Sequence, residues 1–235
     1  MAATTFCTAI KERTAAAHER AESHVFIRAL LSGQLNVRAL VQMMESLVPV
    51  YDQLETSLRE ASTDASVALF DHRRLDRTTR LRDDLRALGR RDPVAVEPAS
   101  RAYADAIRHS TTSPQRLLAH HYTRYLGDLA GGQAIARLVQ RHYEVPSTVL
   151  SYYDFSDLGD LTHYRKQYKA LLDLVPWSPT EQAEFITECQ VSFEASSRLF
   201  SDLALACGMQ VPERASAAGF LAAERAHTVA NAPLR

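Results

Sequence analysis

The longest helical pattern in the sequence begins at Ser113, ends near Tyr143 and carries three glycines at its centre. A capping hydroxyl followed directly by proline is a typical helix start, and apolar residues then recur at helical spacing. Gly127, Gly131 and Gly132 interrupt this pattern, and each glycine costs about 1 kcal/mol relative to alanine inside a helix. A helix that keeps these glycines despite the loss of stability indicates that another group lies close to its bare backbone. That group is either a second helix or a flat ligand.

The rest of the sequence also has the pattern of successive helices. Its eight glycines are few, and both the alternating valine-rich runs and the Asn-Gly or Asp-Gly turns of β-hairpins are missing. The sequence therefore predicts an all-α fold. The expected helices cover residues 5–23, 25–32, 36–61, 72–89, 99–110, 114–143, 158–174 and 178–207, with a loop over 90–98 and a brief helix after Pro146.

The domain organisation follows from length and from the absence of linkers. A chain of 235 residues can bury a substantial single core, and no repeat or low-complexity segment divides it. We expect residues 1–206 to form one domain. The alanine-rich residues 207–235 are expected to form a peripheral, helical C-terminal extension, with its helix over 213–229.

Charge and cysteine content exclude several function classes. The formal net charge of −1 gives no reason to expect a nucleic-acid partner. The N-terminus lacks a signal-peptide pattern, and no apolar run is long enough to cross a bilayer. The three cysteines have an odd count and no metal-type spacing. We therefore expect a cytoplasmic protein with no membrane anchor and no disulfide scaffold.

A histidine and a glutamate in the first expected helix form a candidate metal site. The stretch TAAAHERAE places His18 among alanines, with Glu22 one turn later on the same face. The carboxylate can accept the imidazole Nδ1–H and leave Nε2 free to bind a metal. Lys11, two turns earlier on that side, could meet an acidic group at the edge of a ligand. The spacing alone leaves the alternative open, since such pairs are also common on helix surfaces.

The glycine-bearing helix carries polar groups beside its bare patch. Gly127 and Gly131 share a face, Asp128 and Gly132 form the adjacent row, and Arg124 lies one turn before Asp128. Helix packing alone has no use for a carboxylate and a guanidinium at this place. A flat ligand on the glycines could be contacted by both groups.

Two of these stretches together resemble the haem oxygenases. They are AAAHERAE and HHYTRYLGDLAGGQ, and the resemblance extends over roughly residues 5–206. It implies a helical fold that holds haem b between the first helix and a glycine-kinked distal helix. It also implies an oxidoreductase that cleaves haem with O2 and reducing electrons to biliverdin, CO and Fe2+. The expected physiological use is iron acquisition from haem.

The resemblance also assigns roles to individual residues. It makes His18 the ligand of the haem iron and Glu22 its hydrogen-bond partner. It makes Asp128 the distal catalytic carboxylate, acting through water. The glycine backbone then crowds O2 toward one edge of the ring. The residues with catalytic roles are Tyr51, Arg124, Gly127, Asp128 and Gly131, and the further haem contacts are Lys11, Tyr122, Gly132, Arg165, Lys169 and Phe193.

The same comparison shows where this chain departs from the family pattern. Ala130 stands where many relatives have a serine, Ala15 where the animal enzymes have a second basic residue, and Ser196 where they have an asparagine. These departures concern the propionate contacts and the distal water network. They leave the expected iron ligand and the distal carboxylate in place.

The expected reaction consumes electrons that the chain cannot supply by itself. It has no flavin or nicotinamide fingerprint, so we expect an external electron donor, either ferredoxin with ferredoxin reductase or a flavoprotein reductase. The arginine-rich residues 71–92 could dock such a donor, or they could be a solvated helix face with i/i+4 ion pairs.

Two other function classes stay open: a haem carrier without turnover, and a fold relative with another substrate, such as a thiaminase-like enzyme.

Overall fold

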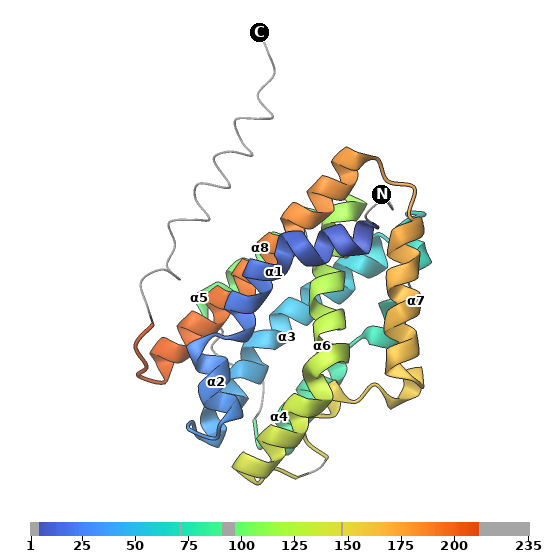
Figure 1. Ribbon diagram of the computed structural model, residues 1–235. Helices are drawn as coiled ribbons and strands as arrows, with labels where there is room; N and C mark the ends of the chain where they lie inside the picture. Colours follow the sequence, from blue (N-terminus) through green and yellow to red (C-terminus); the bar gives the residue numbers. More distant parts are fainter. Residues whose placement is uncertain (1–4, 71, 91–96, 147, 212–235) are drawn as a thin grey trace.

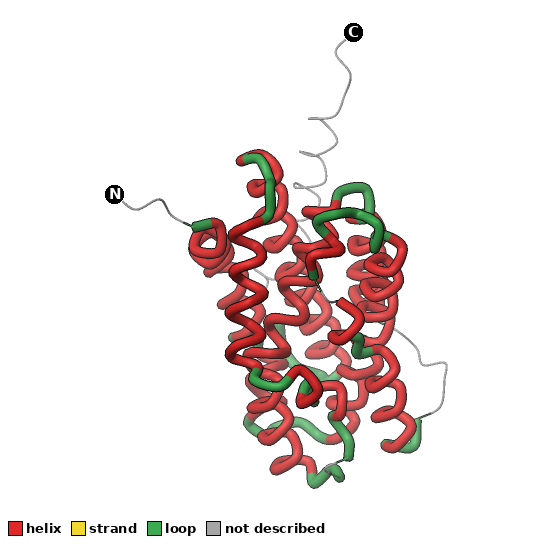
Figure 2. Tube along the Cα trace, turned by 90° about the vertical axis from the view of Figure 1, so that its right-hand side faces the viewer, coloured by secondary structure: helices red, strands yellow, loops and turns green. Residues whose placement is uncertain are grey.

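The computed structural model describes residues 5–70, 72–90, 97–146 and 148–211, and this part of the chain contains helices and loops but no strand (Figure 2). The helices are α1 (Phe6–Glu22), α2 (Val25–Leu31), α3 (Val37–Glu60), α4 (Thr78–Ala87), α5 (Pro98–Ser110), α6 (Pro114–Tyr143), α7 (Leu161–Leu174) and α8 (Pro179–Ala206). Short 3-10 turns lie at η1 (Val67–Leu69), η2 (His72–Leu75), η3 (Ser151–Tyr153) and η4 (Ser156–Leu158). The predicted all-α fold is confirmed.

Side-chain caps fix the starts of the helices that were predicted from serine and proline. The Ser113 hydroxyl accepts the amide of Arg116 at the start of α6, and proline occupies the first turn. At the start of α8, Ser178 and Glu181 form a reciprocal capping box. Each cap satisfies amides that the helix itself leaves unpaired, so these boundaries agree with the sequence to within a residue or two.

Helix α8 is the central scaffold of the molecule. It packs along α6, α1 and α5, while α3 packs against α5 and α4 (Figure 1). Helices α1 and α6 both lie on α8 but have little direct contact with one another. The arrangement therefore keeps α1 and α6, which carry the predicted site residues, apart on a common support.

The predicted helix over residues 72–89 is wrong, because the chain there is split into η2 and α4. The cause is Arg77, whose side chain is buried and donates to the carbonyls of Leu75 and Asp154. The Glu55 carboxylate accepts the backbone amides of Arg77 and Thr78 and starts α4 there. Glu55 and Asp154 come from distant parts of the sequence, so no local pattern could indicate the break.

Two further expectations have different outcomes. The brief helix expected after Pro146 is present only as the 3-10 turns η3 and η4. The helix expected over 213–229 lies outside the described residues.

Helix α6 is continuous from Pro114 to Tyr143, and the kink at its glycines stays a prediction. Within the described part of the chain, no helix has the length and apolar character needed to cross a membrane.

Candidate functional site

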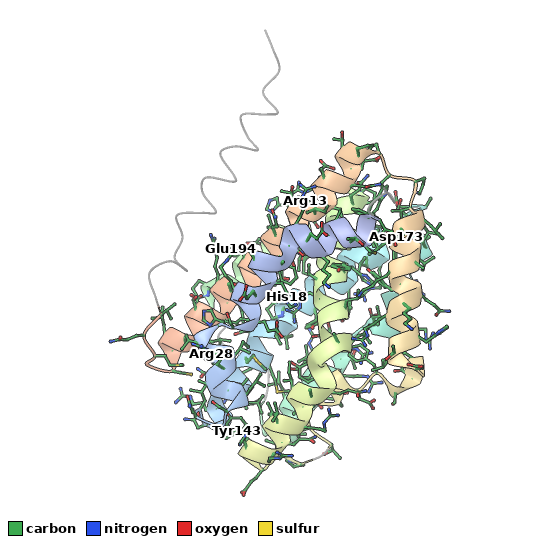
Figure 3. The ribbon with its side chains drawn as sticks, in the orientation of Figure 1. Arg13, His18, Arg28, Tyr143, Asp173 and Glu194 are labelled. Atoms are coloured by element: carbon green, nitrogen blue, oxygen red, sulfur yellow. The ribbon has the colours of Figure 1, made fainter. Side chains whose placement is uncertain are left out.

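The predicted histidine–glutamate pair is present on α1. His18 Nδ1 lies 3.5 Å from Glu22 Oε2, and both side chains are exposed, His18 by 54%. The other side of the imidazole meets α8, where the Phe193 ring packs edge-on with its centroid 5.3 Å away. Figure 3 labels His18 on α1. The pair and the phenyl ring together hold the imidazole at the surface of α1 without burying it.

This histidine is suited to a metal whose other ligands come from outside the protein. Among the described residues, no group of three or more histidine, cysteine, aspartate or glutamate side chains could hold a metal ion. A single imidazole is a poor metal site alone, but it is sufficient as the axial ligand of a porphyrin iron, whose remaining ligands are ring nitrogens. The donor set therefore fits haem.

The three glycines of α6 have different surroundings. A Cβ atom placed on Gly127 would meet nothing within 4 Å, and one on Gly131 would meet only Ile135 Cδ1, at 3.9 Å. A Cβ atom on Gly132 would clash with the Tyr153 ring. The backbone at Gly127 and Gly131 is therefore open to a ligand. At Gly132 the missing side chain makes room for Tyr153, and the contact of Gly132 with a ligand stays a prediction.

A buried carboxylate lies between these glycines. Asp128 is 8% exposed and accepts a short hydrogen bond from the Tyr51 hydroxyl of α3. Arg124 donates from Nη2 to the same hydroxyl at 3.0 Å and lies 3.9 Å from Asp128 Oδ1. The three residues that the sequence assigned to one network are thus brought together. Pro49 precedes Tyr51 by two residues, yet α3 continues through it.

Burial and charge act against one another in this network. Burial raises the pKa of Asp128 above its usual range, and the Arg124 guanidinium and the Tyr51 hydroxyl oppose this rise. Burial also raises the pKa of Tyr51, so its hydroxyl keeps its proton and can donate it to the carboxylate. For Arg124, burial alone would lower the pKa, but the neighbouring Tyr51 and Asp128 outweigh it. The arrangement places a buried carboxyl with a raised pKa beside open helix backbone.

The basic residues predicted at the ligand edge lie on α1 and α7. The start of α1 is bound to α7, since Asp173 accepts the Cys7 amide at 2.8 Å and the Cys7 thiol donates to the Lys169 carbonyl at 3.2 Å. Lys11 and Lys169 are exposed, whereas Arg165 and Tyr122 are half-buried. The structure therefore joins α1 and α7, which carry the three basic residues, and the contact of these residues and of Tyr122 on α6 with a ligand stays a prediction.

The arginine-rich segment has the features of a solvated, ion-paired face. Arg82 lies 3.4 Å from Asp52, Arg90 lies 2.6 Å from Glu45, and Arg77 is buried. Because these three arginines are engaged within the protein, the observations favour the solvated, ion-paired face over a docking surface.

Sequence reasoning missed two tyrosines beside the network. Tyr152 and Tyr153 of η3 are buried, and Tyr153 lies against Gly132. They come from the segment after Pro146, where the sequence predicts only a brief helix and carries no site motif, so no sequence signal pointed to them. Ser196, expected in place of a network asparagine, instead donates to the Ser192 carbonyl.

Comparison with known proteins gives a consistent result. The sequence model of the family described as "Heme oxygenase" matches residues 4–202. The chain is 30% identical to "Heme oxygenase" of Guillardia theta, over 83% of this chain and 84% of that protein. It is 29% identical to "Heme oxygenase 1" of Homo sapiens, over 83% and 70% of the two chains.

Solved structures agree with the sequence comparisons. The heme oxygenase from Leptospira interrogans superposes with a TM-score of 0.80 at 29% identity, covering 84% of this chain and 98% of that one. Heme oxygenase-1 from Synechocystis sp. PCC6803, solved in complex with heme, gives a TM-score of 0.78 at 23% identity, with 97% and 98% covered.

Proposed function

Because the chain belongs to the haem oxygenase family, we propose that it cleaves haem to biliverdin, CO and iron at a site between α1 and α6. The observation that carries this placement is the open backbone at Gly127 and Gly131, next to the buried carboxyl of Asp128. A flat substrate can lie against that backbone with no side chain in the way. His18 on α1 is then the residue that binds from the opposite face.

The α1 side of the site binds and orients the substrate. Glu22 accepts the Nδ1 proton of His18, which fixes the tautomer and leaves Nε2 to ligate the iron. Phe193 limits rotation of the imidazole. The cations Lys11, Arg165 and Lys169, together with the Tyr122 hydroxyl, would pair with the two carboxylates of haem and set the rotation of the ring in its plane.

The α6 side of the site controls space and protons. When bound, haem supplies both the ring that is cleaved and the redox-active iron that reacts with O2. Gly127 and Gly131 leave room only for a small molecule above the ring. The Asp128 carboxyl exchanges protons with water at that place, Tyr51 holds the carboxyl by its hydrogen bond, and Arg124 balances its charge.

The electrons come from outside the chain. We infer an external donor, either ferredoxin with its reductase or a flavoprotein reductase, and a cytoplasmic enzyme that releases iron from haem for use by the cell. The sequence has no flavin or nicotinamide fingerprint, and this supports the need for such a donor.

The direct test is to mix the purified protein with haemin and a reductant in air and to record the absorption spectrum. We expect the Soret band to disappear as the biliverdin bands grow. A Soret band that persists under these conditions would identify a haem carrier, and the proposed reaction would be wrong. The absence of any haem binding would contradict the site itself.

A further inference from the structure

The 3-10 turn η3 contacts α6 one helical turn after the distal carboxyl. Tyr153 of η3 is buried, and a Cβ atom on Gly132 would clash with Cδ1, Cε1 and Cγ of its ring. Gly132 is four residues after Asp128 on the same face of α6, and it directly follows the open backbone of Gly131. The Tyr153 ring therefore lies against the turn that joins the carboxyl to the open glycine.

Two buried charged side chains hold η3 from both ends. Asp84 Oδ2 of α4 accepts the Tyr152 amide at 3.1 Å, and Arg77 Nη1 donates to the Asp154 carbonyl at 2.7 Å. Asp84 is 2% exposed and Arg77 1%. A charged group is costly to bury unless it is hydrogen-bonded, and here each of the two charges bonds to the backbone of one chain neighbour of Tyr153. The position of this ring is thus fixed from outside η3.

The backbone immediately before η3 is strained. Leu150 is buried and has φ 73° and ψ 25°, in the left-handed region that a leucine side chain disfavours. Such a conformation persists only where the surrounding contacts determine it. The Leu150 carbonyl accepts the Tyr153 amide at 3.0 Å, so the strained residue and the ring that meets Gly132 belong to one turn. The fold accepts strain where it places this ring.

The glycine-bearing turns of α6 have little other support. A Cβ atom on Gly127 would meet nothing within 4 Å, and one on Gly131 would meet only Ile135 of the same helix. Of the three glycines, only Gly132 has its Cβ position filled by another element. Because glycine also weakens a helix interior, the contact with Tyr153 lies where α6 most needs support.

We propose that Tyr153 is a positioning residue for haem cleavage, whose ring, held by Asp84 and Arg77, braces α6 between Asp128 and Gly132. Without this brace the helix hydrogen bonds of these turns would open more often. The carboxyl would then spend time away from the open glycine backbone, where it exchanges protons. This role rests on the function proposed above and adds a residue to it.

The test removes the ring that lies on Gly132. Tyr153→Ala is the variant, and Tyr153→Leu carries the same prediction if the alanine variant does not fold. Tyr153→Phe keeps the ring and is the conservative control. Leu203→Ala empties a fully buried position in the last turn of α8 and controls for a general loss of stability.

Two quantities are measured for each protein. Amide hydrogen exchange of the haem-free protein is followed over residues 124–135, with residues 114–121 of the same helix as the internal reference. Haem cleavage is measured in parallel, with kcat and KM separated.

In Tyr153→Ala we expect exchange over residues 124–135 to become about tenfold faster relative to residues 114–121. The kcat should fall about 10–100-fold at nearly unchanged KM, since the carboxyl is misplaced but the groups that bind haem remain. Tyr153→Phe should behave as wild type in both measurements. Leu203→Ala should leave the ratio of the two exchange rates and the kcat unchanged.

A wild-type ratio of exchange rates in Tyr153→Ala and Tyr153→Leu would show that α6 needs no brace and would overturn the proposal. Faster local exchange at a wild-type kcat would also overturn it, because the braced turn would then not position the carboxyl. Tyr153→Phe impaired as much as Tyr153→Ala would assign the effect to the hydroxyl and contradict the brace. Failure of the proposed function is seen separately, as a wild-type protein that does not cleave haem, while the exchange measurement requires no haem and still decides on the brace.

Discussion

Single residues of the site differ mainly in how far they are removed from solvent. The His18–Glu22 pair is exposed, and an exposed pair contributes about 0–1 kcal/mol to stability, so its value lies in fixing the imidazole tautomer. Asp128 is buried, and its raised pKa follows from that burial. Under the proposed function, a carboxylate on each helix thus has a different role: Glu22 of α1 orients the imidazole, and Asp128 of α6 exchanges protons.

The exposure of His18 makes its replacement a clean test of ligation. His18→Ala should leave the free energy of unfolding close to that of wild type, because alanine is the better helix former and little packing is lost. The absorption and resonance Raman signatures of histidine-ligated haem should disappear. His109→Ala, an exposed histidine of α5, is the control and should retain them. A histidine-ligated spectrum in His18→Ala would place the iron on another residue.

The residues of this site were predictable to very different degrees. Helical spacing alone paired His18 with Glu22 and placed Arg124 beside Asp128, and the structure confirms both arrangements. Tyr51 joined them only through the family resemblance, because 77 positions separate it from Asp128. Tyr152 and Tyr153 were not predicted, since contacts between a 3-10 turn and a helix leave no periodic pattern in the sequence.

Among the secondary-structure elements, α6 combines two uses of glycine on neighbouring faces. Gly127 and Gly131 leave space for a ligand, and Gly132 leaves space for Tyr153. The sequence indicated only that the glycines were unusual. The sequence could not distinguish Gly132 from the other two glycines, because the residue that packs against Gly132 comes from η3.

Alanine replacements should separate these two uses. Gly127→Ala should raise the free energy of unfolding by about 1 kcal/mol, because the added methyl group gains helix propensity and meets nothing within 4 Å. The same variant should bind haem more weakly, since the methyl group enters the space of the ligand. Gly132→Ala should instead lower the free energy of unfolding by about 1–3 kcal/mol through overpacking against Tyr153.

Urea unfolding of the haem-free variants measures the free energy of unfolding, and a haem titration of each variant measures its haem affinity. Equal haem affinity in Gly127→Ala and wild type would show that the ligand does not approach this backbone. A Gly132→Ala variant as stable as wild type would show that the contact with Tyr153 is loose.

For the whole molecule, most helix boundaries follow from local signals, while the packing between helices does not. The starts of α6 and α8 carry their caps in the sequence. The break before α4 depends on Glu55 and Asp154, which are distant in sequence from Arg77. The fold class was therefore predictable, and the departures occur where buried charges from separate elements meet.

A partly buried carboxyl beside this break, Asp76, should make stability depend on pH. Burial first, and then the nearby Glu55, raise the pKa of Asp76 from 3.8 to about 6, because Arg59 only partly offsets them. The folded state then binds more protons than the unfolded state between about pH 4 and pH 6, so the free energy of unfolding falls as pH rises through this range.

Asp76→Asn should remove that dependence. We expect the variant to gain stability relative to wild type on going from pH 4.5 to pH 7.5, by a modest amount because the side chain is one-third exposed. Asp157→Asn, an exposed acid of η4, is the control and should show no such gain in urea unfolding. A constant difference between Asp76→Asn and wild type at the two pH values would contradict the assignment.

Under the proposed function, the Asp128 carboxyl serves the reaction and not the binding of haem. Asp128→Ala should bind haem with nearly wild-type affinity, because the ground-state complex is held by His18 and the basic residues at the ring edge. Its rate of biliverdin formation should fall by about 10²–10⁴-fold, the range for loss of a positioned acid–base group.

The decisive measurement is therefore the haem dissociation constant of Asp128→Ala beside its rate of biliverdin formation under a reductant in air, each compared with wild type. We predict an unchanged dissociation constant and a rate that is nearly lost. A variant that forms biliverdin at the wild-type rate, or one that loses haem binding and turnover together, would contradict the account.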